Sequence, residues 1–322
     1  MKAVVRDAYG STDVLRLEEI AAPVAGEGEV LVRVVAAGLD QGVWHLMAGM
    51  PYVMRVAGFG LRAPKNPLLG YDLAGRVEAV GPGAAPFQPG DEVFGTCAGS
   101  FAEYAVARAD RLVPKPANVS FEQAAATPTS GYTALQAVRD HGKVEAGKSV
   151  LVIGAGGGVG TFAVQIAKTR GAEVTGVCGA AKTELVRSIG ADHVIDYTKE
   201  DFTDGRVRYD VILDTAGNRP LSHLRRALTP RGTLVIVGGE DGGKWLGIRR
   251  QLRAAALSPF VGQKLGFFIA KQQSSDLEEL SRLLEAGAIR PVVDRTFPLD
   301  EVPDAIRYLR DGRARGKVVI AA

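Results

Sequence analysis

Hydrophobic and polar positions change their spacing along the chain, and this change divides the sequence into a β-rich part and an alternating part. Up to about residue 118, short apolar runs are separated by breaks rich in glycine and proline, which is typical of antiparallel strands. These runs are 30–35, 75–80 and 101–106. The first part is therefore predicted to be a barrel-like antiparallel module.

From residue 144 to residue 239, apolar runs of strand length alternate with helical patterns. The predicted strands are 150–153, 174–177, 193–195, 211–213 and 233–237, and the helices between them include 183–189 and 221–228. Such alternation predicts a doubly wound parallel sheet with helices on both faces and a ligand at the carboxyl ends of its strands.

The segments before and after this alternating part predict further elements. Ser120 and Gln123 form a capping-box pattern at a helix start, Pro128 interrupts, and a helix resumes at Gly131. Beyond residue 239 the predicted elements are a helix at 276–285, a strand at 291–297, a helix at 299–310 and a strand at 317–320. The last strand could complete either domain.

A glycine-rich turn follows the first strand of the alternating part. The turn reads as a G-x-x-G-x-x-G variant with glycines at 154, 157 and 160, and an amphipathic helix begins at once. A turn without side chains lets a pyrophosphate approach the backbone, and the helix N-terminus offers N–H groups to receive it. The candidate cofactor contacts here are Gly154, Gly157, Gly158, Val159 and Gly160.

The end of the next strand indicates which dinucleotide is bound. An NAD site usually has an acidic residue there, about 20 residues beyond the glycines, whereas this strand ends in Cys178 and Gly179 with Lys182 close behind. The missing carboxylate and the added ammonium favour NADPH; the alternative is that Lys182 is a surface residue. Further candidate cofactor contacts at the strand ends are Cys178, Gly179, Tyr197, Asp214, Gly217, Val237, Gly238 and Gly239.

Length and composition favour two domains and exclude several classes of function. The 322 residues, 46% hydrophobic and 23% charged with a net charge of +3, are typical of an ordinary globular protein with no nucleic-acid binding surface. Cys97 and Cys178 lack metal-ligand spacing. No signal-peptide pattern or membrane-length apolar run is found, so a cytoplasmic protein without a membrane span is expected. The basic and apolar segment 244–253 is interpreted as an amphipathic helix, with a membrane-surface or partner site as the alternative.

Several motifs keep a common order along nearly the whole chain. They are Ala36–Asp40, Leu69–Gly75, Pro89–Gly95, Gly131–Leu135, the glycine turn, Gly190–Tyr197 and Arg315–Val319. With these motifs the chain resembles the medium-chain dehydrogenase/reductase superfamily, in its zinc-independent, quinone oxidoreductase-like branch.

This resemblance implies a fold and a set of contacts. It implies a GroES-like catalytic domain at 1–122, completed by 290–322, and a Rossmann NADPH-binding domain at 123–289. It places Thr133, Gly157, Gly158, Val159, Lys182 and Tyr197 against NADPH and Asp40 beside the nicotinamide, with Arg315 and Lys317 of the last motif as further candidate contacts. It also implies a homodimer.

The resemblance also has implications for zinc binding and for the type of reaction. Zinc-dependent members have a cysteine near Asp40 and a histidine at the position of Tyr71, so no zinc is expected. Without a Lewis acid, hydride transfer to a quinone or an α,β-unsaturated carbonyl is the favoured reaction, since the enolate needs only a proton or one donor. Such substrates are small and hydrophobic.

The candidate catalytic residues are Tyr52 and Tyr71 as donors and Asp40 as their neighbour, either ionised or protonated. In the alternative interpretation Tyr71 fills the vacant metal site, Tyr52 is a core aromatic and Asp40 caps a turn. The apolar segment 51–67 could border the substrate pocket. The other functions considered are a metal-free NADP-dependent alcohol dehydrogenase or carbonyl reductase, and a non-catalytic NADPH-binding protein.

Overall fold

The chain folds into two compact units. The computed structural model describes residues 1–217, 219–238, 245 and 247–322. Unit 1 contains residues 1–132, 272–287 and 291–322, and unit 2 contains residues 133–271 and 288–290. The domain limits expected from the sequence lie at 122/123 and 289/290. They differ from the limits of the compact units and remain predictions.

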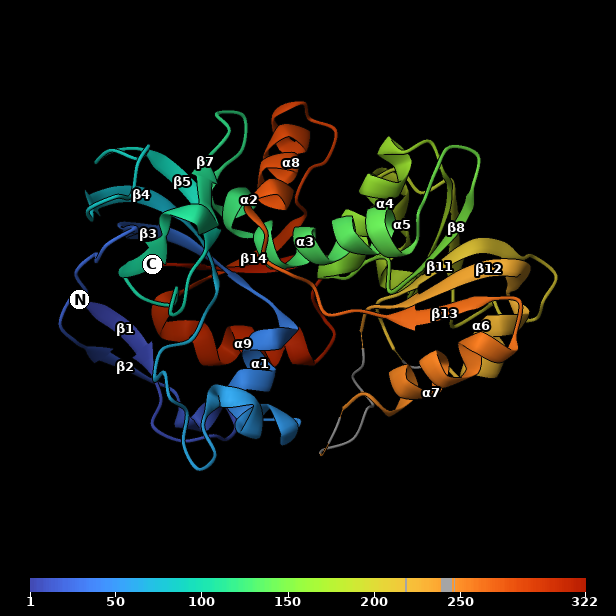
Figure 1. Cartoon of the computed structure of the whole chain (residues 1–322), viewed down its shortest axis with the longest axis horizontal. Helices are drawn as coiled ribbons and strands as arrows, with labels where there is room; N and C mark the ends of the chain where they lie inside the picture. Colours follow the sequence, from blue (N-terminus) through green and yellow to red (C-terminus); the bar gives the residue numbers. More distant parts are fainter. Residues whose placement is uncertain (218, 239–244, 246) are drawn as a thin grey trace. The chain divides into compact units, whose positions relative to one another are not determined.

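The sheet of unit 2 is parallel throughout its described part. Its strands are β8 (Ser149–Ile153), β9 (Glu173–Cys178), β10 (His193–Asp196), β11 (Tyr209–Asp214), β12 (Leu228–Ile236) and β13 (Lys264–Phe267). They lie in the order β10-β9-β8-β11-β12-β13, the order of dinucleotide-binding folds (Figure 1). The predicted doubly wound parallel sheet is confirmed. The switch point lies between β8 and β11.

Helices cover both faces of this sheet (Figure 1). They are α4 (Gly158–Thr169), α5 (Thr183–Ser188), α6 (Leu221–Arg226) and α7 (Arg249–Leu257). Shorter helical segments of this unit are η4 (Ala137–His141), η5 (Ala180–Lys182) and η6 (Ser258–Phe260). Because the strands are buried on both faces, their apolar residues are continuous rather than alternating. Leu151, Ile212 and Leu234 are fully buried in this core.

Unit 1 is built on a mainly antiparallel sheet. Its strands are β3 (Glu29–Leu39), β4 (Asp72–Val80), β5 (Glu92–Thr96), β6 (Tyr104–Arg108), β7 (Leu112–Pro114), β14 (Val293–Pro298) and β15 (Lys317–Ala321). The order is β14-β15-β3-β4-β5-β7, and β6 pairs with β3. A separate pair is formed by β1 (Lys2–Val5) and β2 (Arg16–Glu19). The last strand, which could have joined either domain, pairs with β3 and so belongs to this sheet.

The helices of unit 1 come from distant parts of the chain. They are α1 (Gln41–Ala48), α2 (Phe121–Ala125), α3 (Pro128–Gln136), which continues into unit 2, α8 (Ser274–Glu285) and α9 (Val302–Arg310). Shorter turns are η1 (Thr12–Val14), η2 (Arg55–Phe59), η3 (Ala109–Arg111) and η7 (Leu299–Glu301).

Two sequence predictions at these helices can be compared with the structure. The capping box at Ser120 is confirmed, since its hydroxyl accepts from Gln123 N while the Gln123 side chain accepts from Ser120 N. The expected interruption is found at residues 126–127, but the second helix, α3, resumes at Pro128 rather than at Gly131, because a proline without an N–H is tolerated at a helix start. Among the described residues, no helix is long and apolar enough to cross a bilayer.

Candidate active site

The glycine turn of unit 2 leaves no room for side chains at two positions. Gly154 has a φ of +82°, and a Cβ atom there would lie 2.5 Å from Thr215 Oγ1. A Cβ atom on Gly160 would lie 2.1 Å from the Gly154 carbonyl oxygen. The third glycine therefore lets α4 pack directly on the turn, as its spacing predicts.

The N-terminus of α4 is open to an anion. Gly157 is the N-cap residue and provides no side-chain cap, and residues 157–159 are partly accessible between buried neighbours. The first N–H groups of a twelve-residue helix therefore point outward with the positive end of the helix dipole. Gly157, Gly158 and Val159 thus present backbone atoms with the chemistry that binds a pyrophosphate.

Lys182 lies directly beside this turn. A Cβ atom on Gly156 would be 2.8 Å from Lys182 Cδ and 2.9 Å from its Cβ, so the lysine stem rests against the glycine backbone. At the end of β9 a Cβ atom on Gly179 would be 3.5 Å from Tyr197 Oη, and Tyr197 is half exposed. The ends of β9 and β10 thus bring Lys182, Gly179 and Tyr197 into one area around the turn.

Cys178 lies at the same strand end but is buried. Burial and the Asp196 carboxylate raise the pKa of its thiol, and Lys182 and Arg187 oppose this shift. Cys178 is therefore a neutral thiol that fixes the end of β9. Its backbone oxygen accepts a hydrogen bond from Tyr197 N at 3.1 Å.

The ends of β11 and β12 are tied together through Asp214. This fully buried carboxylate accepts from Gly217 N at 2.9 Å and forms an ion pair with Arg250 of α7. Its backbone oxygen accepts from Val237 N and Gly238 N. Both carboxylate oxygens are thus engaged within the protein, and Gly217 and Gly238 offer backbone atoms at the edge where a ligand of this fold binds.

In unit 1, three strand ends bring charged side chains together. β3 runs antiparallel to both β4 and β15, with Gly38 opposite Asp72 and Leu39 opposite Val318. The end of β3, which leads to Asp40, therefore meets the starts of β4 and β15, which carry Asp72 and Lys317. Gly38 makes the approach possible, because a Cβ atom there would lie 2.9 Å from Asp72 Cβ.

These side chains form a buried cluster, called the Asp40 cluster below, with two hydroxyl groups from the start of α3. Lys317 Nζ lies 2.5 Å from Asp40 Oδ1 and 4.0 Å from Asp72 Oδ2. Ser130 Oγ donates to Asp40 Oδ1 at 2.8 Å, and Thr129 Oγ1 donates to Asp72 Oδ1 at 2.5 Å. Asp40 and Thr129 are partly exposed, with 16% for the Asp40 side chain, whereas Asp72, Ser130 and Lys317 are at most 1% exposed.

The two carboxyl groups of this cluster have opposite pKa shifts. The pKa of Asp40 is lowered: burial raises it, but Lys317 and the hydrogen bonds from the surrounding groups outweigh burial. Burial, followed by the neighbouring Asp40 carboxylate, raises the pKa of Asp72 well above its ordinary value. The surroundings therefore favour the charged form of Asp40 and the neutral form of Asp72.

The two candidate tyrosines have different surroundings. Tyr71 precedes Asp72 and packs half-buried against the core of unit 1; burial raises the pKa of its phenol, and Arg6 opposes the shift. Tyr52 lies half-buried under the guanidinium of Arg55, 4.9 Å from the ring centroid. Tyr71 thus keeps its proton at neutral pH and can donate it.

Several other predicted cofactor contacts lie elsewhere in the two units. Thr133 is the first residue of unit 2 and is partly buried, and Arg315 is exposed in unit 1. Lys317 also belongs to unit 1, where it is 1% exposed and its ammonium is held by Asp40. Gly239 lies outside the described residues. The roles of these residues in cofactor binding remain predictions.

Sequence reasoning missed the partners of Asp40. Asp72, Thr129 and Ser130 were not proposed as site residues, although Asp72 lies within one of the motifs and the other two lie at a predicted helix start. A buried aspartate in a strand otherwise made of apolar residues was the available signal, because such a group needs partners.

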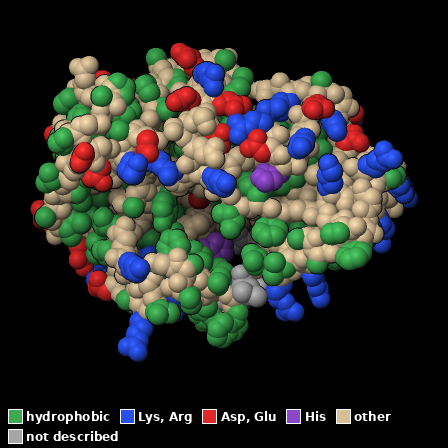
Figure 2. Space-filling model, in the orientation of Figure 1, with side chains coloured by type: hydrophobic (Ala, Val, Ile, Leu, Met, Phe, Trp, Pro, Cys, Tyr) green, Lys and Arg blue, Asp and Glu red, His purple; other side chains and the backbone are tan. Residues whose placement is uncertain are grey.

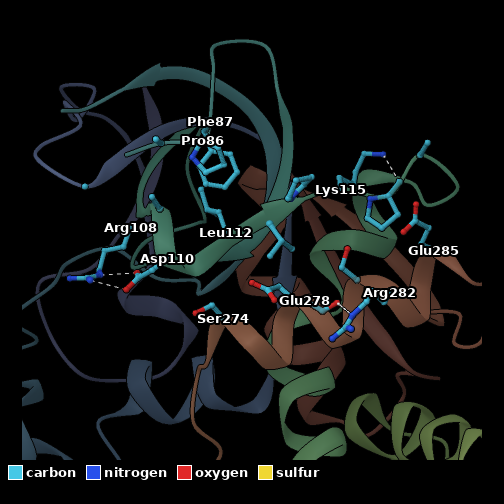
Figure 3. Close-up of a pocket in the computed structure, with 18 of the residues that line it drawn as sticks. Pro86, Phe87, Arg108, Asp110, Leu112, Lys115, Ser274, Glu278, Arg282 and Glu285 are labelled. Carbon is cyan, nitrogen blue, oxygen red and sulfur yellow. Dashed lines mark hydrogen bonds and ion pairs between the residues drawn. The ribbon is translucent and has the colours of Figure 1, made fainter. Parts of the chain in front are cut away.

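Unit 1 also has a shallow cavity of about 1010 Å³ that none of the predicted site residues lines. Figure 3 shows it between β7 and α8, with Phe87 and Leu112 on one side and Glu278 and Arg282 on the other. Of its charged groups, Arg108 and Asp110 form an ion pair at 2.8 Å, and Lys115 pairs with Glu92 outside the cavity. It is therefore a polar surface depression without the chemistry of the Asp40 cluster.

Few side chains that could bind a metal ion lie close together in the described structure. Within the part of the chain that the structure describes, no three His, Cys, Asp or Glu side chains lie together in a way that could hold a metal ion. Near Tyr71 and Asp72, Cys97 has a thiol whose pKa is raised by burial and by Asp72, which disfavours the thiolate form that zinc binds. The zinc-independence expected from the sequence remains a prediction.

Comparisons with known proteins agree with this architecture. Residues 26–117 match the alcohol dehydrogenase GroES-like domain, and residues 189–320 match a domain described as zinc-binding dehydrogenase. A 2-methylene-furan-3-one reductase of Solanum lycopersicum is 35% identical, over 99% of this chain and 79% of the relative. An NADPH-dependent alkenal/one oxidoreductase of Arabidopsis thaliana, chloroplastic, is 36% identical over the same shares.

A solved structure of a quinone oxidoreductase from Coxiella burnetii is similar over 100% of this chain and 99% of its own, with a TM-score of 0.86 and 26% identity. The expected combination of a GroES-like domain and a Rossmann sheet is confirmed. Since relatives above 30% identity match nearly the whole chain, it belongs to the medium-chain dehydrogenase/reductase family, in the quinone oxidoreductase-like branch, and is an oxidoreductase.

Proposed function

We propose that this oxidoreductase uses NADPH to reduce a conjugated acceptor, either an α,β-unsaturated carbonyl compound or a quinone. The observation that carries the proposal is Lys182 lying against the glycine turn with no carboxylate at the end of β9. The names of the relatives, an alkenal/one oxidoreductase, a furanone reductase and a quinone oxidoreductase, support the same acceptor class.

The residues that would hold the cofactor follow from the geometry of unit 2. The backbone of Gly157, Gly158 and Val159 would bind the pyrophosphate, since a helix N-terminus and a side-chain-free turn suit an anion. Lys182 and Tyr197 would bind the 2′-phosphate, as an ammonium and a phenol next to the turn. When bound, NADPH supplies the hydride.

The proton that completes the reduction would come from a tyrosine of unit 1. Hydride addition to a conjugated acceptor leaves an enolate oxygen or its equivalent, which needs a proton or a hydrogen-bond donor. Tyr71, whose phenol carries its proton at neutral pH, is the first candidate, and Tyr52 is the second. Asp40, whose pKa is lowered, would act by orienting charge rather than by giving up a proton.

The acceptor class is tested by steady-state kinetics. NADPH oxidation is followed with an enone, a 1,4-quinone, a simple aldehyde, and a simple alcohol with NADP. The proposal requires turnover of the enone or quinone and little turnover of the aldehyde or alcohol. The reverse pattern would indicate a carbonyl reductase or alcohol dehydrogenase, and NADPH binding without turnover of any acceptor would indicate a non-catalytic protein. If turnover required bound zinc, the proposal of a metal-free reaction would be contradicted.

The cofactor choice is tested by reversing the charge of Lys182. Lys182→Glu should weaken NADPH binding by about ten- to a hundredfold and NADH binding much less, because it removes a charge-assisted contact that only NADPH makes. Lys264→Glu, which changes an exposed lysine of β13, is the matched control and should leave both affinities unchanged. Equal losses for NADPH and NADH in Lys182→Glu would remove this residue from the phosphate site.

The homodimer and the cytoplasmic location expected from the sequence remain predictions. Sedimentation equilibrium of the purified chain tests the first, and cell fractionation tests the second.

A further inference from the structure

The segment after α1 exposes large apolar side chains in unit 1. Val56 and Leu61 are 74% and 69% exposed, and Val53 and Phe59 are also exposed. We call these four residues the apolar tip. In Figure 2, hydrophobic side chains project from the lower edge of the molecule over the segment that follows α1. Four exposed apolar side chains within nine residues of the chain indicate an interaction surface.

The backbone of the apolar tip is fixed from within unit 1. Tyr9 Oη donates to the carbonyl oxygens of Phe59 and Gly60, both at 2.8 Å, and Lys65 N donates to Phe59 O at 3.0 Å. Arg55 lies over the Tyr9 ring at 4.4 Å and donates from Nε to Gly49 O at 2.9 Å. The loop is thus closed on itself and presents its apolar side chains without needing to refold.

The charges around the apolar tip all have one sign along the chain. No aspartate or glutamate occurs between Asp40 and Asp72, a stretch that contains Arg55, Arg62 and Lys65. Arg62 and Lys65 are exposed, and they directly follow the tip along the chain. Apolar side chains flanked by exposed cations are the combination that binds the interface of a bilayer containing anionic lipid.

We propose that the apolar tip, with Arg62 and Lys65, docks this protein on the surface of an anionic lipid bilayer. Val56 and Leu61 enter the boundary between headgroups and acyl chains, and the two cations contact lipid phosphates. The attachment is peripheral and reversible, since the inserted surface is small and a single weak anchor does not hold a protein permanently. Docking does not depend on the proposed reaction, although an enzyme attached in this way would be close to acceptors dissolved in the lipid.

The test is co-sedimentation of the purified full chain with two kinds of vesicle. One contains only phosphatidylcholine, and the other contains equal parts of phosphatidylcholine and phosphatidylglycerol. The wild-type chain should sediment with the anionic vesicles, and the attachment should weaken as salt is raised. No binding to anionic vesicles, or equal binding to both kinds, would overturn the proposal.

Two double variants test the residues themselves. Val56→Ser/Leu61→Ser should weaken binding to anionic vesicles roughly tenfold or more, and Arg62→Gln/Lys65→Gln should weaken it by about fivefold for each cation removed. The matched controls are Val24→Ser, at a valine of unit 1 that is 87% exposed, and Arg208→Gln/Arg231→Gln, at two exposed arginines of unit 2. Both controls should bind like wild type. Binding by Val56→Ser/Leu61→Ser at the wild-type level would reject the apolar tip as the docking surface.

A second measurement separates lipid from a second copy of the chain as the occupant. Sedimentation velocity without vesicles compares wild type with Val56→Ser/Leu61→Ser. An unchanged assembly state is required by the proposal, whereas an assembly that the variant disperses makes the tip a contact between copies and overturns it. Turnover of a water-soluble enone without vesicles is assayed in parallel, so that failure of docking and failure of the proposed reaction give different results.

Discussion

The most informative single substitution is Lys317→Met, because it removes the only cation of the Asp40 cluster. The Lys317 side chain is 1% exposed, and its Nζ lies 2.5 Å from Asp40 Oδ1. Methionine preserves most of the stem and removes the charge. Removing one partner of a buried ion pair typically costs 3–5 kcal/mol, and since Asp40 keeps 16% exposure we expect about 3 kcal/mol of lost unfolding free energy.

The loss should depend on pH in a defined direction. In the wild type the pKa of Asp40 is lowered, so its stabilising effect is full above the unfolded-state pKa of about 3.9 and is lost as pH falls through the folded-state pKa. Without Lys317, burial raises the folded-state pKa, so the variant loses stability as pH rises from about 4. The difference between the two proteins should therefore grow from about pH 4 to about pH 7.

Urea unfolding measures this difference if one unit is observed at a time. The chain has two tryptophans, Trp44 in α1 and Trp245 in unit 2, so a Trp245→Phe background makes fluorescence report on unit 1. The double variant Asp40→Asn/Lys317→Met should lose clearly less than the sum of the single losses, because no unpaired charge remains. A loss below about 1 kcal/mol for Lys317→Met at neutral pH, or additive losses, would refute the reasoning.

Two further predictions concern the stability of unit 1. Gly38→Ala should destabilise unit 1 by about 1–3 kcal/mol in the same urea assay, because its Cβ would lie 2.3 Å from Ala125 O and 2.9 Å from Asp72 Cβ. The matched control is Gly42→Ala in α1, where nothing lies within 4 Å and helix propensity predicts a gain of roughly 0.5–1 kcal/mol; equal effects would contradict the close packing. Ser120→Ala should cost about 1 kcal/mol through loss of the capping box, and Ser120→Thr should retain most of it; a neutral Ser120→Ala would show that the cap adds no stability.

The sequence predicts unit 2 well because its signals are local. The strand before Gly154 and the helix after it are specified by adjacent residues, and each later strand has its own apolar run bounded by turns. Strand β13 was missed, since Lys264–Phe267 is short and lacks alternation. The lateral order of the strands follows from pairing between segments far apart, for which a single sequence has no local signal.

The Asp40 cluster could not be predicted in the same way. Asp40 and Lys317 are 277 residues apart and meet only because β3 and β15 pair in one register. Lys317 was instead proposed as a cofactor contact, because it lies in a recognisable motif whose spatial neighbours the sequence does not reveal. The pKa directions of Asp40 and Asp72 likewise depend on burial and on that meeting, so the ionised member of the pair could not be chosen beforehand.

The placement of β15 has a consequence for how the protein is made. Strand β15 lies between β14 and β3 inside the sheet of unit 1, so that sheet cannot close until residues 317–321 have left the ribosome. Residues 133–271 emerge earlier and already include every strand of the parallel sheet, so unit 2 can fold first during translation. Until the last strand arrives, the second half of β3 has an open edge and Asp40 lacks its cation, so this edge is exposed to pairing with other chains.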